Sequence, residues 1–142
     1  MPRFSRSSNL KKESCHPKLI ELLDKAIEGY DFTILEGFRA PEKQQELYKS
    51  GFSRVLNSKH NVYPSLAVDI VPYPIPDEWG DIDYNNPPDA EKLEQQVLER
   101  SRFYHLIGYI KGIADMLNIE IRCGADWDDD KIFTDQRFHD LV

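Results

Sequence analysis

Prolines and glycines divide the first half of the 142-residue sequence into short segments, and no other feature restricts its fold as strongly. Pro17 and Pro41 suit the first turn of a helix, where the missing backbone N–H would have no partner in any case. Gly29 and Gly51 suit the ends of helices, because glycine readily adopts the conformations that terminate them. The sequence therefore predicts one helix between Pro17 and Gly29 and another between Pro41 and Gly51.

Short apolar segments with the composition of β-strands lie at residues 31–36 (DFTILE), 66–71 (LAVDIV) and 119–123 (IEIRC). A long helix is predicted from about residue 89 to 118, because apolar residues recur there along one stripe. The stripe consists of Leu93, Val97, Phe103 or Tyr104, Ile107, Ile110, Ala114 and Leu117. The proline-rich residues 72–88 are expected to be irregular. The predicted fold is α+β, with a small antiparallel sheet and helices packed on one side.

Length and charge restrict the function classes. A chain of 142 residues is typical of one domain, so a single domain over residues 1–142 is predicted. No apolar run approaches the roughly 20 residues of a membrane helix, and the N-terminal residues lack the apolar centre of a signal peptide. The net charge is −7 and the basic residues are dispersed, which argues against nucleic acid as a partner. Cys15 and Cys123 are expected to be unpaired thiols without a functional role, as in a reducing cytoplasm.

A carboxylate inside the apolar segment 66–71 is the anomaly of the sequence. Asp69 is flanked by apolar residues, and an ionised carboxylate in a buried strand needs a partner or a cation. His60 precedes it across a turn-like stretch, and an imidazole with a carboxylate is a normal part of a catalytic zinc shell. The spacing alone leaves two interpretations open. The pair holds a metal ion, or Asp69 is satisfied within the protein and His60 lies on the surface.

The stretch SKHNVYPSLAVD, residues 58–69, resembles the Ser-x-His and Ala-x-Asp signature of the hedgehog-related zinc peptidases that act on peptidoglycan. This family includes D-alanyl-D-alanine carboxypeptidases and the L-alanyl-D-glutamate endopeptidases of phage endolysins. Other stretches resemble the family in the same order: DFTILEGFRAPEKQQELYKSG, LAVDIVPYP and CGADWD. The resemblance extends over residues 16–142 and implies the fold of this family.

The resemblance also implies roles for individual residues. His60 and Asp69 would be two of the three protein ligands of a Zn²⁺ cofactor. Arg39 would hydrogen-bond the substrate carbonyl or the developing oxyanion, for which a fixed guanidinium is well suited. Ser58 would line the site and contact substrate. Without the resemblance, Arg39 reads as a surface or ion-paired residue after a strand, and Ser58 as a turn or capping residue.

The last residues depart from the family pattern, which ends with an acidic residue, two spacers and a histidine. Asp140 matches the acidic residue, the general base that takes a proton from the water that zinc activates. The histidine that is the third ligand would fall just beyond Val142, so the domain is expected to lack its extreme C-terminus. His139 is a poor substitute, because Gln136, three residues before it, cannot act as a base. A substituted ligand and a degenerate, inactive site remain as alternatives.

The resemblance implies a zinc-dependent endopeptidase that cleaves the L-alanyl-D-glutamate bond of the peptidoglycan stem peptide. The alternatives are a D-alanyl-D-alanine carboxypeptidase and a catalytically inactive peptidoglycan-binding protein. An endolysin of this kind is expected to be a monomer without membrane insertion. It would reside in the bacterial host cytoplasm before lysis and then act on the cell wall.

Overall fold

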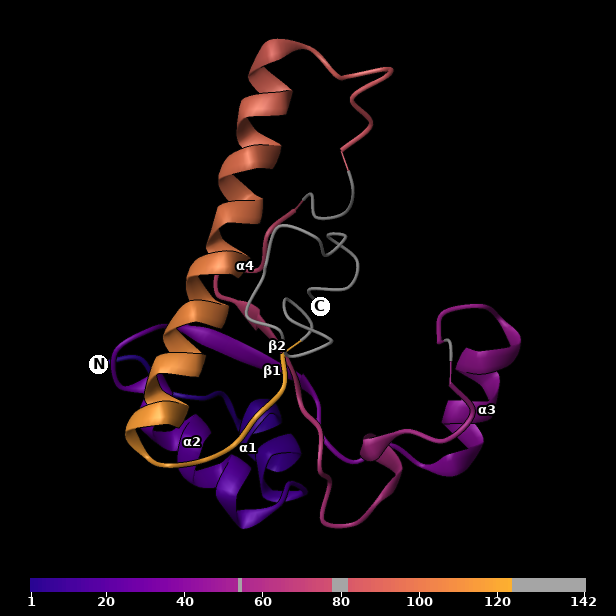
Figure 1. Cartoon of the computed structure of the whole chain (residues 1–142), viewed down its shortest axis with the longest axis vertical. Coiled ribbons are helices and arrows are strands. Elements are labelled where there is room, and N and C mark those ends of the chain that lie inside the picture. The colour runs from indigo at the N-terminus through magenta and orange to yellow at the C-terminus, as the bar shows by residue number, and fades with distance from the viewer. Residues whose placement is uncertain (54, 78–81, 124–142) are drawn as a thin grey trace.

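The computed structural model describes residues 1–53, 55–77 and 82–123, and its architecture is α+β (Figure 1). The elements in chain order are α1 (Arg6–Glu13), α2 (Pro17–Ile27), β1 (Phe32–Glu36), α3 (Pro41–Lys49), the short 3₁₀ helix η1 (Lys59–Asn61), β2 (Asp69–Pro72) and α4 (Ala90–Met116). The predicted fold class is thereby confirmed. No helix of the described part of the chain is long and apolar enough to span a bilayer.

Strands β1 and β2 form an antiparallel pair. Phe32 is paired with Pro72 and Ile34 with Ile70, but the register shifts between Ile34 and Glu36. Because of this irregularity, Glu36 is the residue opposite Asp69 at the end of the pair. The sheet therefore brings two carboxylates to the same end.

The main hydrophobic core lies between α2, α4 and β1. Its fully buried members are Leu22, Leu23, Ala26, Ile27, Phe32, Ile34, Leu106, Ile110, Ala114 and Ile119. Pro17 begins α2 as predicted, and the apolar residues of α2 lie on one face, as the spacing required. In β1, alternate residues are buried because successive side chains of a strand point to opposite sides.

Helix α1 was not predicted from the sequence. It is polar, with Ser8 its only buried residue, so it carries no apolar stripe to indicate a helix. Ser5 begins the helix by accepting a hydrogen bond from the Ser8 N–H. The Ser8 hydroxyl accepts the backbone N–H of Ile34 at 3.2 Å and lies 3.0 Å from the Thr33 hydroxyl. A buried polar contact, rather than apolar packing, therefore fixes α1 against β1.

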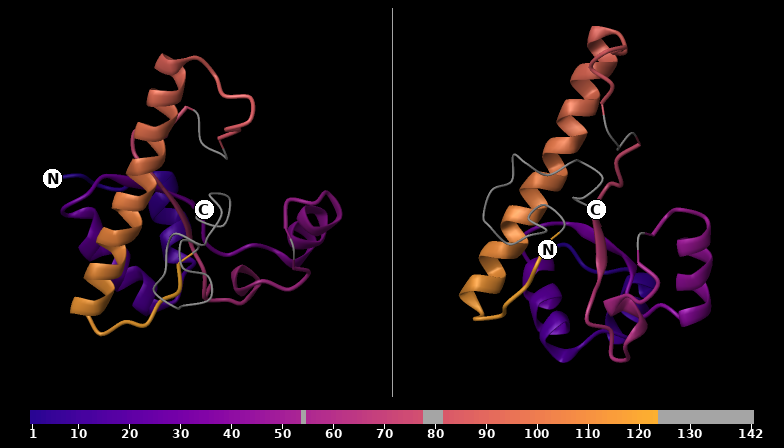
Figure 2. Two further views of the ribbon diagram at one scale, coloured as in Figure 1. Left: turned by 45° about the horizontal axis from the view of Figure 1, so that its top comes forward. Right: turned by 45° about the vertical axis from the view of Figure 1, so that its right-hand side comes forward.

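The long helix predicted from about residue 89 to 118 is confirmed by α4, whereas the strand predicted at residues 119–123 is wrong. Residues 119–123 form no strand, because Asn118 adopts a positive φ of 56° and Ile119 packs into the helical core instead. The buried stripe of α4 begins only at Phe103, so Val97 is 48% exposed. The reason is that the first half of α4 extends away from the core, past the other helices (Figures 1 and 2).

We call residues 38–53 and 55–64 the α3 arm, and the helix α3 of this arm stands apart from the other helices (Figures 1 and 2). Pro41 begins α3, and Gly51 follows its end with a φ of 82°, a conformation that favours glycine. Both boundaries agree with the sequence prediction. The arm leaves the sheet after β1 and returns to it before β2.

Candidate metal centre

His60 and Asp69 are brought together, as the sequence predicted. The His60 Nε2 atom lies 3.4 Å from the Asp69 Oδ1 atom. His60 comes from η1 on the α3 arm, and Asp69 is the first residue of β2. The interpretation of His60 as a surface residue is wrong, because the residue is buried, with 7% of its area exposed.

A backbone carbonyl fixes the orientation of the His60 ring. The Nδ1 atom lies 2.7 Å from the carbonyl oxygen of Gly37, and because a carbonyl can only accept, Nδ1 carries the proton. The lone pair of the neutral ring is therefore on Nε2, facing Asp69. Burial lowers the pKa of His60, but Asp69 and the Gly37 carbonyl outweigh it, so that this pKa is raised above its usual value.

The His60–Asp69 geometry fits a zinc ion. Ligands bound at about 2.0–2.1 Å to a tetrahedral zinc lie roughly 3.3 Å from each other. The observed distance of 3.4 Å between Nε2 and Oδ1 matches this separation and is longer than a good direct hydrogen bond. A ligating histidine typically donates its other ring N–H to a carbonyl or carboxylate, as His60 does to Gly37.

Asp69 is less buried than the sequence suggested. Its side chain is 40% exposed because it lies at the first position of β2, and residues 66–68 before it are outside the strand. The cost of burying a carboxylate therefore does not explain this residue. Its partial exposure instead leaves the Asp69 carboxylate accessible to solvent.

Arg39 links the carboxylates at this end of the sheet. Its Nη2 atom lies 2.7 Å from Glu36 Oε2 and 3.4 Å from Asp69 Oδ2. Its Nη1 atom donates to Gln44 Oε1 at 2.7 Å. The guanidinium is thus held beside Asp69 by several partners. Its side chain is only 11% exposed, so the interpretation of Arg39 as a surface residue is wrong and that of an ion-paired residue holds.

Glu36 and Gln44 belong to the same network, and neither was selected from the sequence. Burial raises the pKa of Glu36, but hydrogen bonds and charges from Arg39 and Lys43 hold it below its usual value. Gln44 is completely buried, and its amide nitrogen donates to Ser53 Oγ and to the Val55 carbonyl. The one sequence signal for Gln44 was its place in the family-like helix QQELY.

The other predicted site residues have different outcomes. Ser58 caps η1: its hydroxyl accepts the His60 N–H at 3.2 Å, and its own N–H donates to Asn61. This is the capping role that the sequence left open, and contact of Ser58 with substrate stays a prediction. Asp140, His139 and the expected ligand position beyond Val142 lie outside the described residues. Within the described ranges, no three His, Cys, Asp or Glu residues are grouped as metal ligands.

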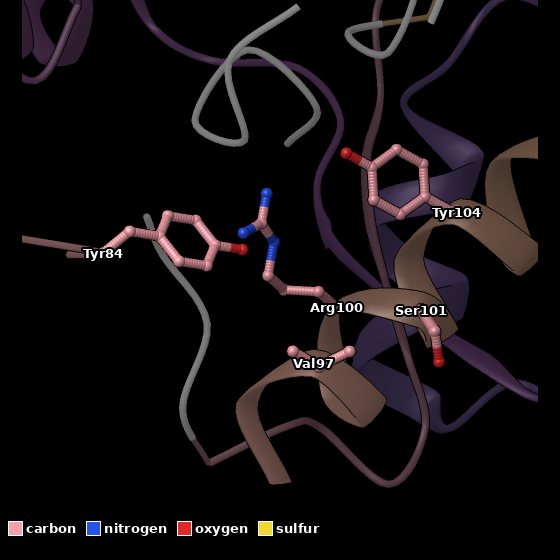
Figure 3. A pocket seen from close by; sticks show the side chains of 5 residues that line it. All are labelled: Tyr84, Val97, Arg100, Ser101 and Tyr104. Carbon is pink, nitrogen blue, oxygen red and sulfur yellow. The ribbon is translucent and has the colours of Figure 1, made fainter. Parts of the chain in front are cut away.

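A separate hollow of about 270 Å³ lies beside the first half of α4 (Figure 3). It is lined by Tyr84, Val97, Arg100, Ser101 and Tyr104. None of these lining residues belongs to the network around His60 and Asp69.

Comparisons with a solved structure and with a family model show the fold and the family of this chain. The solved structure of the Serratia marcescens L-Ala D-Glu endopeptidase ChiX has the same fold, with a TM-score of 0.65 and 21% sequence identity, covering 91% of this chain and 84% of that chain. Among curated proteins, no match was found. The model of the phage L-alanyl-D-glutamate peptidase family matches residues 1–141. The chain belongs to this family, which confirms the resemblance seen in its motifs and identifies it as a peptidase of peptidoglycan.

Proposed function

We propose that this protein is a zinc-dependent endopeptidase that hydrolyses the L-alanyl-D-glutamate bond of the peptidoglycan stem peptide. The observation that carries the proposal is the His60–Asp69 pair, whose Nε2 and Oδ1 atoms are 3.4 Å apart with Nδ1 held by Gly37. Membership of the phage L-alanyl-D-glutamate peptidase family supports the choice of bond. Zinc bound by this pair would supply the Lewis acidity that activates water and polarises the scissile carbonyl.

The protein's own residues would orient the site and move the proton. His60 presents an unprotonated Nε2 because Gly37 holds its Nδ1 proton. Arg39 is held beside Asp69 and would place a positive charge near the carbonyl oxygen on which negative charge develops. Asp140 is proposed as the base that takes a proton from the attacking water and returns it to the leaving amine.

Digestion of purified muropeptides tests the proposal. Cleavage by the zinc-loaded protein should release a peptide that begins with D-glutamate and leave L-alanine on the muramyl sugar, as mass spectrometry would show. A chelator should abolish the reaction and added zinc should restore it. His60→Ala should be inactive, whereas His105→Ala should remain active, because His105 is an exposed residue of α4 whose ring packs against Tyr30.

Other products would contradict the proposal in distinguishable ways. Release of free D-alanine would identify a carboxypeptidase instead. Binding of muropeptides without any cleavage, with zinc present, would favour the inactive peptidoglycan-binding protein. Activity that survives complete metal removal would exclude the metal centre at His60 and Asp69.

A further inference from the structure

The connection between α1 and α2, residues 14–16, holds both ends of the α3 arm. At the outgoing end, the Ser14 hydroxyl accepts the backbone N–H of Phe38 at 2.9 Å. At the returning end, the Ser14 carbonyl accepts the N–H of Ser65 at 2.8 Å, and the His16 N–H donates to the Ser65 carbonyl at 2.8 Å. One short connection therefore fastens the arm at the points where it leaves and rejoins the body.

The fit at the outgoing end is close. A Cβ atom on Gly37 would lie 2.4 Å from the Lys11 carbonyl oxygen and 2.5 Å from Ser14 Oγ, so only glycine is accommodated there. The Ser14 hydroxyl donates to the Lys11 carbonyl at 2.6 Å, which fixes the direction of its proton. Its lone pairs are then left to accept the Phe38 N–H.

The contact with Ser14 reaches His60 through one peptide unit. The N–H of Phe38 and the carbonyl of Gly37 belong to the same planar group, so fixing one fixes the direction of the other. Ser14 holds the N–H side of this group, and His60 Nδ1 donates to its carbonyl side at 2.7 Å. The chain of contacts is short and contains a single rigid element between the two side chains.

We propose that Ser14 is a positioning residue for His60. By holding the peptide unit between Gly37 and Phe38, it aims the carbonyl that keeps the proton on Nδ1 and the lone pair on Nε2. The inference rests on the proposed role of His60 as a zinc ligand. It assigns a role in the site to the α1–α2 connection, which precedes all the predicted site residues in the sequence.

Ser50 provides a matched control. Like Ser14, it is the C-terminal capping residue of a helix, and its hydroxyl also donates to a carbonyl in the last turn, that of Glu46 at 2.9 Å. Among the contacts of its hydroxyl, however, none reaches the peptide unit that holds His60. Ser14→Ala and Ser50→Ala therefore remove the same kind of cap, but only the former releases the Phe38 N–H.

The experiment measures zinc affinity and the tautomer of His60 in the full chain. Zinc affinity is determined by competition with a chelating indicator, and the tautomer by long-range ¹H–¹⁵N spectra of the metal-free protein with the ring neutral. Ser14→Ala should bind zinc about tenfold more weakly, the low end for residues that orient metal ligands, and should show a larger share of the Nε2–H tautomer. Ser50→Ala should match the wild type in both measurements.

Wild-type affinity and an unchanged Nδ1–H tautomer in folded Ser14→Ala would overturn the inference. Should that variant not fold, hydrogen exchange of the wild type decides. Zinc should then slow exchange of the Phe38 and Ser65 amides more than that of the Ser50 amide, because coupling between two sites is reciprocal. Equal effects on all three amides would refute the role of Ser14. A wild type that binds no zinc contradicts the proposed function, whereas the tautomer measurement still tests Ser14.

Discussion

At the scale of single residues, one guanidinium lets two carboxylates face each other. Glu36 and Asp69 are opposite in the strand register, where like charges repel. Arg39 Nη2 contacts Glu36 Oε2 and Asp69 Oδ2, which leaves Asp69 Oδ1 facing His60. The two oxygens of Asp69 therefore have separate tasks, one toward the arginine and one toward the metal position.

Glu36→Gln should reduce stability at neutral pH by about 1 kcal/mol, since it removes a carboxylate paired with Arg39 and Lys43. The pKa of Glu36 is lowered in the folded protein. Its contribution is therefore present above the unfolded-state pKa and is lost as the pH falls through the folded-state pKa. The free energy of unfolding in urea, measured for both proteins at pH 7 and at about pH 3, checks this. A difference that does not shrink in acid would contradict it.

Side chains of the site could be predicted from the sequence, whereas their supports could not. His60, Asp69 and Arg39 stand in recognisable motifs, and the structure brings all three together. The Gly37 carbonyl that orients His60 is a backbone group, which every residue possesses. Nothing in a sequence indicates which carbonyl will face a ring once the chain has folded.

At the scale of elements, the boundaries set by proline and glycine were predictable and the polar contacts were not. Pro17 and Pro41 begin helices as expected, because their effect is local. Helix α1 was missed because its role depends on a hydrogen bond between Ser8 and Ile34 of β1, two residues that are far apart in the sequence. Residues 119–123 have the apolar pattern of a strand, but that pattern serves packing against helices here.

Ser8→Ala should destabilise the protein by about 1–3 kcal/mol, because it leaves the buried Ile34 N–H without the oxygen that accepts it. Ser7→Ala is the matched control, since Ser7 is the exposed neighbour in the same helix, and it should change stability by less than about 0.5 kcal/mol. Urea unfolding of both variants provides the comparison. Equal losses would show that α1 contributes helix stability alone and no specific contact with β1.

Gln44→Ala should also destabilise the protein by about 1–3 kcal/mol, because Arg39 Nη1 and the Val55 carbonyl each lose a partner within the α3 arm. Gln45 is the exposed neighbour in α3, so Gln45→Ala should be nearly neutral. Chemical unfolding followed by circular dichroism measures both. Gln44→Ala should also lower kcat/KM for muropeptides, since Arg39 would be less firmly held beside Asp69. Unaltered stability and activity in Gln44→Ala would exclude this support.

At the scale of the whole molecule, the candidate ligands come from two different parts of the fold. His60 belongs to the α3 arm and Asp69 to the sheet, and the helix α3 of this arm stands apart from the other helices (Figure 1). A metal ion bound by both would tie the arm to the sheet. Binding of zinc should consequently be coupled to the stability of the folded protein.

Zinc at about 100 times its dissociation constant should raise the free energy of unfolding by about 2.7 kcal/mol, provided that the unfolded chain does not bind it. The gain should appear as a higher melting temperature in calorimetry and should disappear with a chelator. His60→Ala and Asp69→Ala should each lose most of the gain, because either change removes one ligand from the pair. His105→Ala should retain the gain, because His105 is an exposed residue of α4. This control excludes a general effect of losing an imidazole. An equal zinc effect in all of these proteins would place the metal elsewhere, because zinc binding that is unchanged by loss of His60 or of Asp69 does not use these side chains as ligands.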